Sequence, residues 1–292
     1  MASADVAAGS RVTPEKSSKA KTFRTYAGVA IIVIWGLIPF YWMAVVAFRE
    51  VGFTFDTTPW PQHVTLDNFR TAFDESLGNE FGQALINSTI ISVTTTVLAL
   101  IVGVFAAYAL VRLEFPGKYA VLGLIISASM FPPVALVTPL FQLFTDLDWI
   151  GTYRALVIPS ISFVLPLTIY LLTAFFSEMP WGLEEAARID GCTKAQAFRM
   201  VILPLAAPGL FTTAILAFIA AFNEFLLATL LSDERTQPVT VAIAEFTGAQ
   251  PQQVPYTAIM AAGTIVTIPL VIIVLIFQRR IVTGLTAGGV KG

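Results

Sequence analysis

Apolar residues gather in six long runs, and shorter polar segments separate them. Each run has the length of about 20 residues that a helix needs to cross a ~30 Å hydrocarbon core. Because backbone polar groups cannot stay unpaired in lipid, runs of this kind are expected to be helices. The predicted spans are 26–48, 84–111, 119–144, 155–176, 201–231 and 258–278. The predicted fold class is an all-α integral membrane protein with six transmembrane helices.

The amino-acid composition agrees with an integral membrane protein. Hydrophobic residues make up 56% of the sequence and charged residues 12%, against about 25% charged in soluble domains. The net charge of -2 and the absence of basic runs with interleaved aromatics exclude nucleic acid as a partner. A single cysteine, Cys192, and a single histidine, His63, are too few for a disulfide or a metal cluster.

Basic residues indicate which side of the membrane each segment faces. Of the 17 Lys and Arg residues, 13 lie in the two tails and in alternate loops, and 4 lie on the other side. The positive-inside rule therefore places both termini in the cytoplasm. The resulting division has tails 1–25 and 279–292, a transmembrane domain 26–278, a cytoplasmic loop 177–200, and outer segments 49–83 and 232–257.

Prolines mark several of the predicted spans for irregularity. The third span holds Pro132-Pro133 and Pro139, and the fourth holds Pro159 and Pro166. A proline inside a helix removes one hydrogen bond and tends to kink the helix. Broken helices suit a molecule that opens and closes.

The loop 177–200 is a charged segment between two long apolar runs. Pro180 suits the first turn of a helix, and Glu184 and Glu185 would lie near the positive end of its dipole. Gly191 can adopt the left-handed conformation that ends a helix. A short helix over about 180–190 is predicted.

A second helix is predicted directly after that glycine. Thr193 and Gln196 have the spacing of a capping box, so this helix begins there and continues toward the membrane. The first helix presents small side chains on one face, which would let a partner approach its backbone closely. This face consists of Leu183, Ala186, Ala187 and Asp190. The alternative, a helix lying on the bilayer, is disfavoured because large apolar residues are few.

Asn223 and Glu224 fall within the predicted fifth span. An ionisable residue inside a transmembrane helix is costly and normally faces a cavity or a partner. Phe222 and Phe225 add aromatic surface beside this pair. These four residues are candidates for a translocation path or for a subunit interface, and the sequence leaves both interpretations open.

The loop resembles the coupling loop of ABC importer permeases. It reads Glu185-Ala186-Ala187, Gly191 and then Val201-Ile202-Leu203-Pro204, with valine where the family has isoleucine. The tail from Gly284 to Gly292 resembles the second permease of maltose-type carbohydrate importers. Further matching pieces are Asn223-Glu224-Phe225-Leu226-Leu227, Ala84-Leu85-Ile86-Asn87-Ser88 and the segment from Arg112 to Lys118. Together they are most similar to trehalose-importer permeases of actinobacteria.

This resemblance implies a type I ABC importer permease fold in a bacterial plasma (inner) membrane. The implied partners are a homologous second permease subunit, two ATPase subunits and an extracytoplasmic sugar-binding protein. ATP and Mg would be bound by the ATPase subunits, so this chain would bind no cofactor and would not be an enzyme. The sequence contains no Walker-type nucleotide motif.

The resemblance also implies roles for particular residues. The residues expected to dock on the ATPase are Glu185, Ala186, Ala187, Asp190 and Gly191. The C-terminal Gly288, Gly289 and Lys291 are expected to contact the ATPase as well. The second outer segment, 232–257, is expected to reach toward the binding protein.

Two alternatives remain at this stage. One keeps the importer but changes its cargo to glycerol phosphate or another polyol. The other is a stand-alone secondary carrier that uses Glu224 as a proton site. Such a carrier would be expected to show an internal repeat and several membrane-embedded ionisable groups, which the sequence does not display.

Overall fold

The structure is a computed structural model that describes residues 19–180, 182–246 and 254–287. Within these residues, five helices are long and apolar enough to cross a membrane. They are α1 (Lys19–Ala47), α3 (Phe81–Arg112), α6 (Tyr153–Glu178), α9 (Leu203–Phe222) together with the short α8 (Lys194–Ala197) before it, and α12 (Tyr256–Ala287). A sixth span forms if the bent pair α4 (Lys118–Ser129) and α5 (Val137–Asp146) is counted as one. The predicted all-helical membrane fold is confirmed.

The third predicted span is not one straight helix. The segments Lys118–Ser129 and Pro133–Asp146 meet at 85°, and the second begins with a 3-10 turn, Pro133–Leu136. Pro132 has an extended backbone, with ψ at 120°, because the proline that follows it disfavours the helical conformation. Single prolines elsewhere, such as Pro159 and Pro166, lie inside a helix that continues. The double proline therefore decides where the span breaks.

The fifth membrane helix ends earlier than the predicted span 201–231. Helix α9 ends at Phe222, and residues up to 231 form a turn and the separate short helix α10 (Ala228–Leu231). The apolar run continues through this region, which is why hydropathy extended the predicted span over 201–231.

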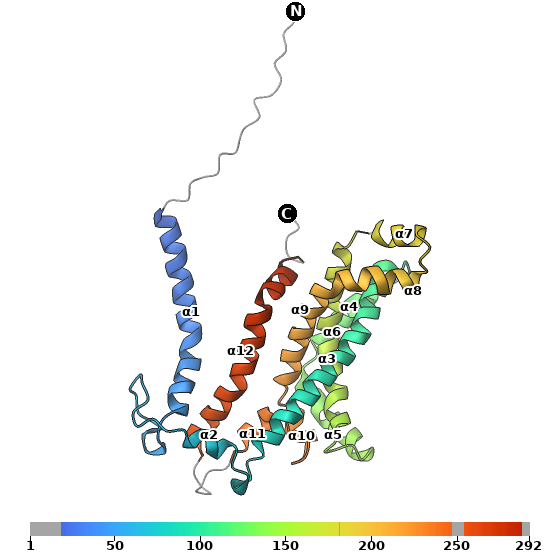
Figure 1. The fold of residues 1–292 in the computed structure, drawn as a ribbon. Coiled ribbons are helices and arrows are strands. Elements are labelled where there is room, and N and C mark those ends of the chain that lie inside the picture. The colour runs from blue at the N-terminus through green and yellow to red at the C-terminus, as the bar shows by residue number, and fades with distance from the viewer. Residues whose placement is uncertain (1–18, 181, 247–253, 288–292) are drawn as a thin grey trace, which may run out of the picture.

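Helices α3, α6 and α9 pack together on one side of the molecule, and α1 packs against α12 on the other (Figure 1). Glycines allow α3 and α9 to approach α6 closely. A Cβ atom added at Gly103 would lie 2.7 Å from Thr168 Cγ2 on α6, and one at Gly209 would lie 2.5 Å from the Phe175 ring. Small residues at such contacts are how membrane helices gain packing energy without a hydrophobic driving force.

The remaining short elements lie at the two ends of the helical bundle. Helices α7 (Gly182–Ile189) and α8 lie at the end where α1 begins and α12 ends, which agrees with the predicted sidedness (Figure 1). At the opposite end lie α2 (Asp67–Ala72), α10 and α11 (Val239–Ala244). The 3-10 turns Val51–Phe53 and Glu75–Leu77 belong to the first outer segment.

The first outer segment is fastened to the end of α1. Arg49 is fully buried and donates hydrogen bonds to the carbonyl oxygens of Asp56 and Thr58. Asn68 Nδ2 donates to the carbonyl oxygens of Ala47, at 2.8 Å, and of Arg49, at 2.6 Å. The segment thus packs on the membrane domain.

Candidate coupling surface and the Glu224 turn

The loop 177–200 forms the predicted helix, glycine turn and helix over its described residues. Helix α7 ends at Ile189, and Gly191 has a φ of +94°, a left-handed conformation that glycine adopts without strain. The Cys192 N–H donates to the carbonyl of Ala187 at 3.0 Å across this turn. The sharp reversal between α7 and α8 is therefore a property of the glycine.

A capping box begins α8, as predicted. Thr193 Oγ1 accepts a hydrogen bond from the Gln196 N–H at 3.3 Å, and Gln196 Oε1 accepts one from the Thr193 N–H at 2.8 Å. From Lys194 the chain stays helical to Phe222, through a π-helical turn over Phe198–Ile202. The loop thus leads without a break into the fifth span.

Four of the five predicted docking residues are exposed. These are Glu185, Ala186, Asp190 and Gly191. Ala187 is only 7% exposed because α7 packs against α8 and the π-helical turn on this side. The side chain of Ala187 is therefore turned into the protein, and its small size permits this packing. Ile189, at 86% exposed, is the most exposed large apolar residue among the described residues of the loop.

Glu184 points inward, unlike its neighbour Glu185. Its Oε1 accepts a hydrogen bond from the Tyr108 hydroxyl at 2.9 Å, and its Oε2 lies 4.0 Å from Arg112 Nε. Sequence reasoning assigned Glu184 only to the helix dipole and missed this contact. A usable signal was the i, i+4 spacing of Tyr108 and Arg112, which places both on one face of α3.

A pocket of about 150 Å³ opens beside this contact. Both acidic and basic side chains line it. The lining residues are Tyr108, Arg112, Leu113, Glu184, Glu185, Arg188 and Lys194.

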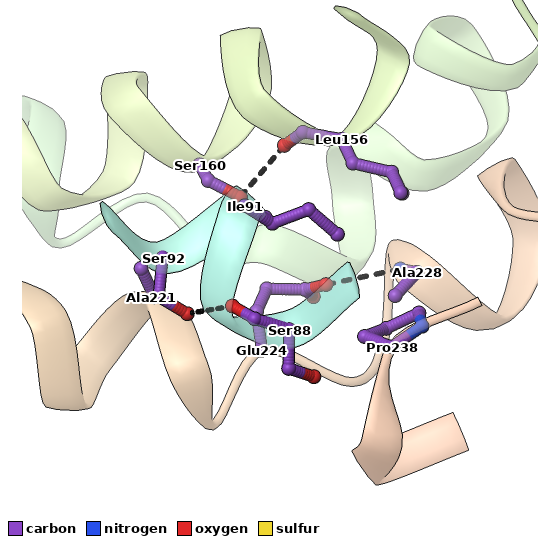
Figure 2. A pocket seen from close by; sticks show the side chains of 9 residues that line it. All are labelled: Ser88, Ile91, Ser92, Leu156, Ser160, Ala221, Glu224, Ala228 and Pro238. Atoms are coloured by element: carbon purple, nitrogen blue, oxygen red, sulfur yellow. Dashed lines mark hydrogen bonds between the residues drawn. The ribbon is translucent and has the colours of Figure 1, made fainter. Parts of the chain in front are cut away.

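Glu224 lies in the turn after α9 rather than inside a transmembrane helix. Its Oε1 accepts a hydrogen bond from the Leu227 N–H at 2.8 Å, and its Oε2 accepts one from the Ala228 N–H at 3.0 Å. Figure 2 shows the carboxylate directed toward Ala228. The side chain thus satisfies amide groups at the start of α10, a role that neither sequence interpretation had foreseen.

The space around Glu224 is small. A cavity of about 10 Å³ adjoins it, lined by residues that include Ser88, Ser92 and Ser160 (Figure 2). This volume suffices for about one water molecule and excludes a sugar. The cavity that Glu224 lines is therefore too small for a sugar, and the choice between a translocation path and a subunit interface stays a prediction.

The other three residues of this group differ in exposure. Phe222 is 8% exposed and belongs to a core cluster with Phe81 and Phe246. Asn223 is exposed, and its Nδ2 donates to the carbonyl of Ile219 at 2.8 Å. Phe225 is 44% exposed. Asn223 and Phe225 are therefore available to a ligand or to another subunit, whereas Phe222 is part of the core.

Asn87 connects three parts of the chain, and sequence reasoning recorded it only as a point of resemblance. It is fully buried. Its Nδ2 donates to the carbonyls of Arg235 and Gln237, both at 3.0 Å, and its Oδ1 accepts from Gln83 at 3.0 Å and from the Tyr153 hydroxyl at 2.7 Å. All four hydrogen-bonding positions of the amide are used. The second outer segment is thereby fixed to α3 and α6.

Two predictions fall outside the described residues. The C-terminal residues Gly288, Gly289 and Lys291 lie there, and so does the stretch 247–253 of the second outer segment. Their expected contacts stay predictions.

The described residues form a helical membrane bundle in which an exposed helix leads through a glycine turn into a transmembrane helix, the arrangement expected of a membrane transport subunit. The chain belongs to the family of binding-protein-dependent transport system inner membrane components, whose model matches residues 99–286. This assignment confirms a multi-pass inner-membrane transport subunit rather than an enzyme. It also removes the alternative of a stand-alone secondary carrier.

Three relatives are similar over nearly their whole length. The trehalose transport system permease protein SugB of Mycobacterium tuberculosis is 47% identical over 263 residues, covering 90% of this chain and 95% of the relative. The trehalose/maltose permease protein MalG of Thermococcus litoralis is 43% identical over 268 residues, covering 91% and 95%. The sulfoquinovosyl glycerol permease protein SmoH of Agrobacterium fabrum is 38% identical over 272 residues, covering 91% and 93%.

Solved structures share the fold. A chain of a bacterial ABC transporter that imports the polysaccharide alginate matches with a TM-score of 0.73 and 23% identity, covering 91% of this chain and 99% of that chain. A second match, with a TM-score of 0.65, 19% identity and coverage of 89% and 94%, is from an alginate transporter in complex with its alginate-bound periplasmic protein.

Proposed function

We propose that this chain is one permease subunit of an ABC importer that moves trehalose, or a related disaccharide such as maltose, into the cytoplasm. The observation that carries the proposal is the 47% identity to a trehalose permease over 90% of the chain. A trehalose/maltose permease at 43% identity supports the same class of cargo.

The proposed partners bind beside the membrane domain and at its two ends. A homologous second permease completes the membrane domain, and two ATPase subunits bind ATP and Mg in the cytoplasm. Helix α7 docks on one ATPase subunit through Glu185, Ala186, Asp190 and Gly191, which are exposed. An extracytoplasmic sugar-binding protein meets the outer segments. A periplasmic protein bound to an alginate transporter of the same fold supports this last contact.

In the proposed mechanism this chain converts ATPase motion into alternating access. Closure of the ATPase dimer moves the docked α7, and the continuous helix from Lys194 to Phe222 carries the motion into the membrane. The membrane halves then rock as rigid bodies between inward-open and outward-open states. The chain itself contributes surfaces and rigidity, and the hydrolysis takes place on the partner subunits.

The test is ATPase activity of the purified complex, reconstituted with its binding protein and a panel of sugars. We expect trehalose to stimulate ATP hydrolysis most strongly and maltose to stimulate it less. The panel includes a sulfoquinovosyl glycerol and glycerol phosphate, because one relative carries a glycoside of glycerol. Stimulation by glycerol phosphate alone would move the cargo to the polyol class. If no ATPase subunits co-purify with the chain, the importer proposal is wrong.

A further inference from the structure

We propose that Glu184 is a positioning residue that fastens the coupling helix α7 to the cytoplasmic ends of α3 and α6. Force on α7 would then reach α3 directly and α6 through Arg112, and not only through the covalent path into α9. The inference rests on the proposed docking of α7 on an ATPase and deepens it.

The contact joins three helices at one point. Glu184 on α7 accepts a hydrogen bond from the Tyr108 hydroxyl on α3, at 2.9 Å, and forms an ion pair with Arg112, at 4.0 Å. Arg112 Nη2 also donates to the carbonyl of Met179, at 3.1 Å, which is the C-cap residue of α6. A single arginine therefore lies between the ends of α3, α6 and α7.

Burial makes this contact stiff. The Arg112 side chain is 1% exposed and the Glu184 side chain 14% exposed. A hydrogen bond or ion pair away from water is screened little, and removing one partner leaves a buried charge without its counterpart. Separating α7 from α3 would therefore be costly, so the two helices move together.

The tyrosine adds a packing contact to the polar one. Its ring lies 4.6 Å from the ring of Phe198, in the π-helical turn, and 6.3 Å from the ring of Phe176, near the end of α6. Tyr108 thus links α3 to α7, to the π-helical turn and to α6.

The two adjacent glutamates of α7, Glu184 and Glu185, face in different directions. Glu184 and Ala187 stand at i and i+3 on one helical face, and both are turned toward the protein. Glu185, Ala186 and Asp190 are exposed. One face of α7 therefore packs on the membrane domain, and the exposed residues on the rest of its surface are available to a partner.

The experiment compares variants in the complete importer, reconstituted in liposomes, by the number of trehalose molecules imported per ATP hydrolysed. Glu184→Gln keeps the size of the side chain and removes its charge. Tyr108→Phe keeps the ring contacts and removes the hydroxyl. We expect each to lower the ratio by about tenfold, since each removes a buried hydrogen bond to a charged group or the charge itself. Assembly with the ATPase should persist because Glu185 and Gly191 are unchanged.

The matched control is Glu178→Gln, which neutralises an exposed carboxylate at the end of α6. We expect the wild-type ratio for this variant. A merely structural role for Glu184 would lower the amount of assembled complex without changing the sugar imported per ATP. A wild-type ratio in both Glu184→Gln and Tyr108→Phe would overturn the proposal.

A second measurement does not need transport. Amide hydrogen exchange of the complex should become faster in α7 and at the end of α3 in both variants, and unchanged in the control. Unchanged exchange would contradict the fastening role even if Glu184→Gln assembles poorly. If the wild-type chain does not associate with ATPase subunits, the proposed function fails, whatever these variants do.

Discussion

The side-chain oxygen of Ser88, on α3, accepts a hydrogen bond from the backbone N–H of Val239 at 2.7 Å, although 151 positions separate the two residues. Beside it, Asn87 binds the carbonyls of Arg235 and Gln237. Two consecutive residues of α3 thus fix the start of α11 and the segment before it. The second outer segment is therefore anchored at a defined point on the transmembrane domain.

This anchor predicts a large effect of Asn87→Leu on stability. The substitution keeps a similar volume and removes four hydrogen bonds, two of them to backbone carbonyls that are left without this donor. We expect a loss of about 3 kcal/mol, measured as a lower thermal unfolding temperature in detergent. Thr89→Val serves as the control, because Thr89 is exposed and its hydroxyl bonds only within α3. Equal unfolding temperatures for the two variants would contradict the assigned role of Asn87.

Replacement of Gly191 by valine should uncouple the importer. The φ of +94° is unfavourable for a β-branched residue, with a strain of about 1–3 kcal/mol. Among the described residues nothing lies within 4 Å of an added Cβ atom, so the effect comes from the backbone and not from a clash. We expect the permease to stay in the membrane while co-purification of the ATPase and sugar uptake are lost. Gly182→Ala, also in open space but without a positive φ, should retain both.

Glu224→Gln should affect folding more than sugar affinity. The carboxylate accepts two hydrogen bonds through its two oxygens, and a glutamine has one acceptor oxygen. We expect a loss of about 1 kcal/mol of stability, as for a lost helix cap, with the KM for trehalose uptake unchanged. A selective rise in KM at normal stability would instead return Glu224 to the translocation path.

Gly209→Ala should disturb the contact of α9 with α6. The added methyl would lie 2.5 Å from the Phe175 ring, so the ring or the helix must shift. We expect a destabilisation of about 1–3 kcal/mol, typical of overpacking, with lower yield of folded protein. The control is Gly123→Ala on α4, where the described residues leave open space around the glycine. A stable, active Gly209→Ala variant would show that this contact tolerates extra volume.

Local features of the sequence were sufficient to predict that the apolar runs form membrane helices and to predict the shape of the coupling loop, but not where the third span bends or where the fifth ends. The length of each apolar run, the glycine at 191 and the capping pair Thr193 and Gln196 act within one or two turns of the chain. Their effects depend on neighbours in sequence, so they could be predicted before any tertiary contact was known. The double proline at 132–133 is also a local feature. It predicted a kink in the third span, but not that the bend would be as large as 85°.

Hydropathy failed where a polar group was satisfied by the chain itself. Leucines after Glu224 extend the apolar run, so the sequence placed this residue inside a helix. In the folded chain its carboxylate binds the Leu227 and Ala228 amides and the helix ends. Neither hydrophobic periodicity nor composition shows that a side chain accepts hydrogen bonds from backbone amides a few residues further along the chain.

The sequence by itself determined the class of protein, the presence of the membrane helices and the shape of the loop 177–200, whereas the bend in the third span and the end of the fifth came from the structure. Only the tertiary structure decided that Glu184 faces Tyr108 and Arg112 while Glu185 faces outward. It also decided that Asn87 holds a segment about 150 residues away. The physical reason is that these contacts join helices distant in sequence, and the direction of each side chain depends on how α3, α6 and α7 pack.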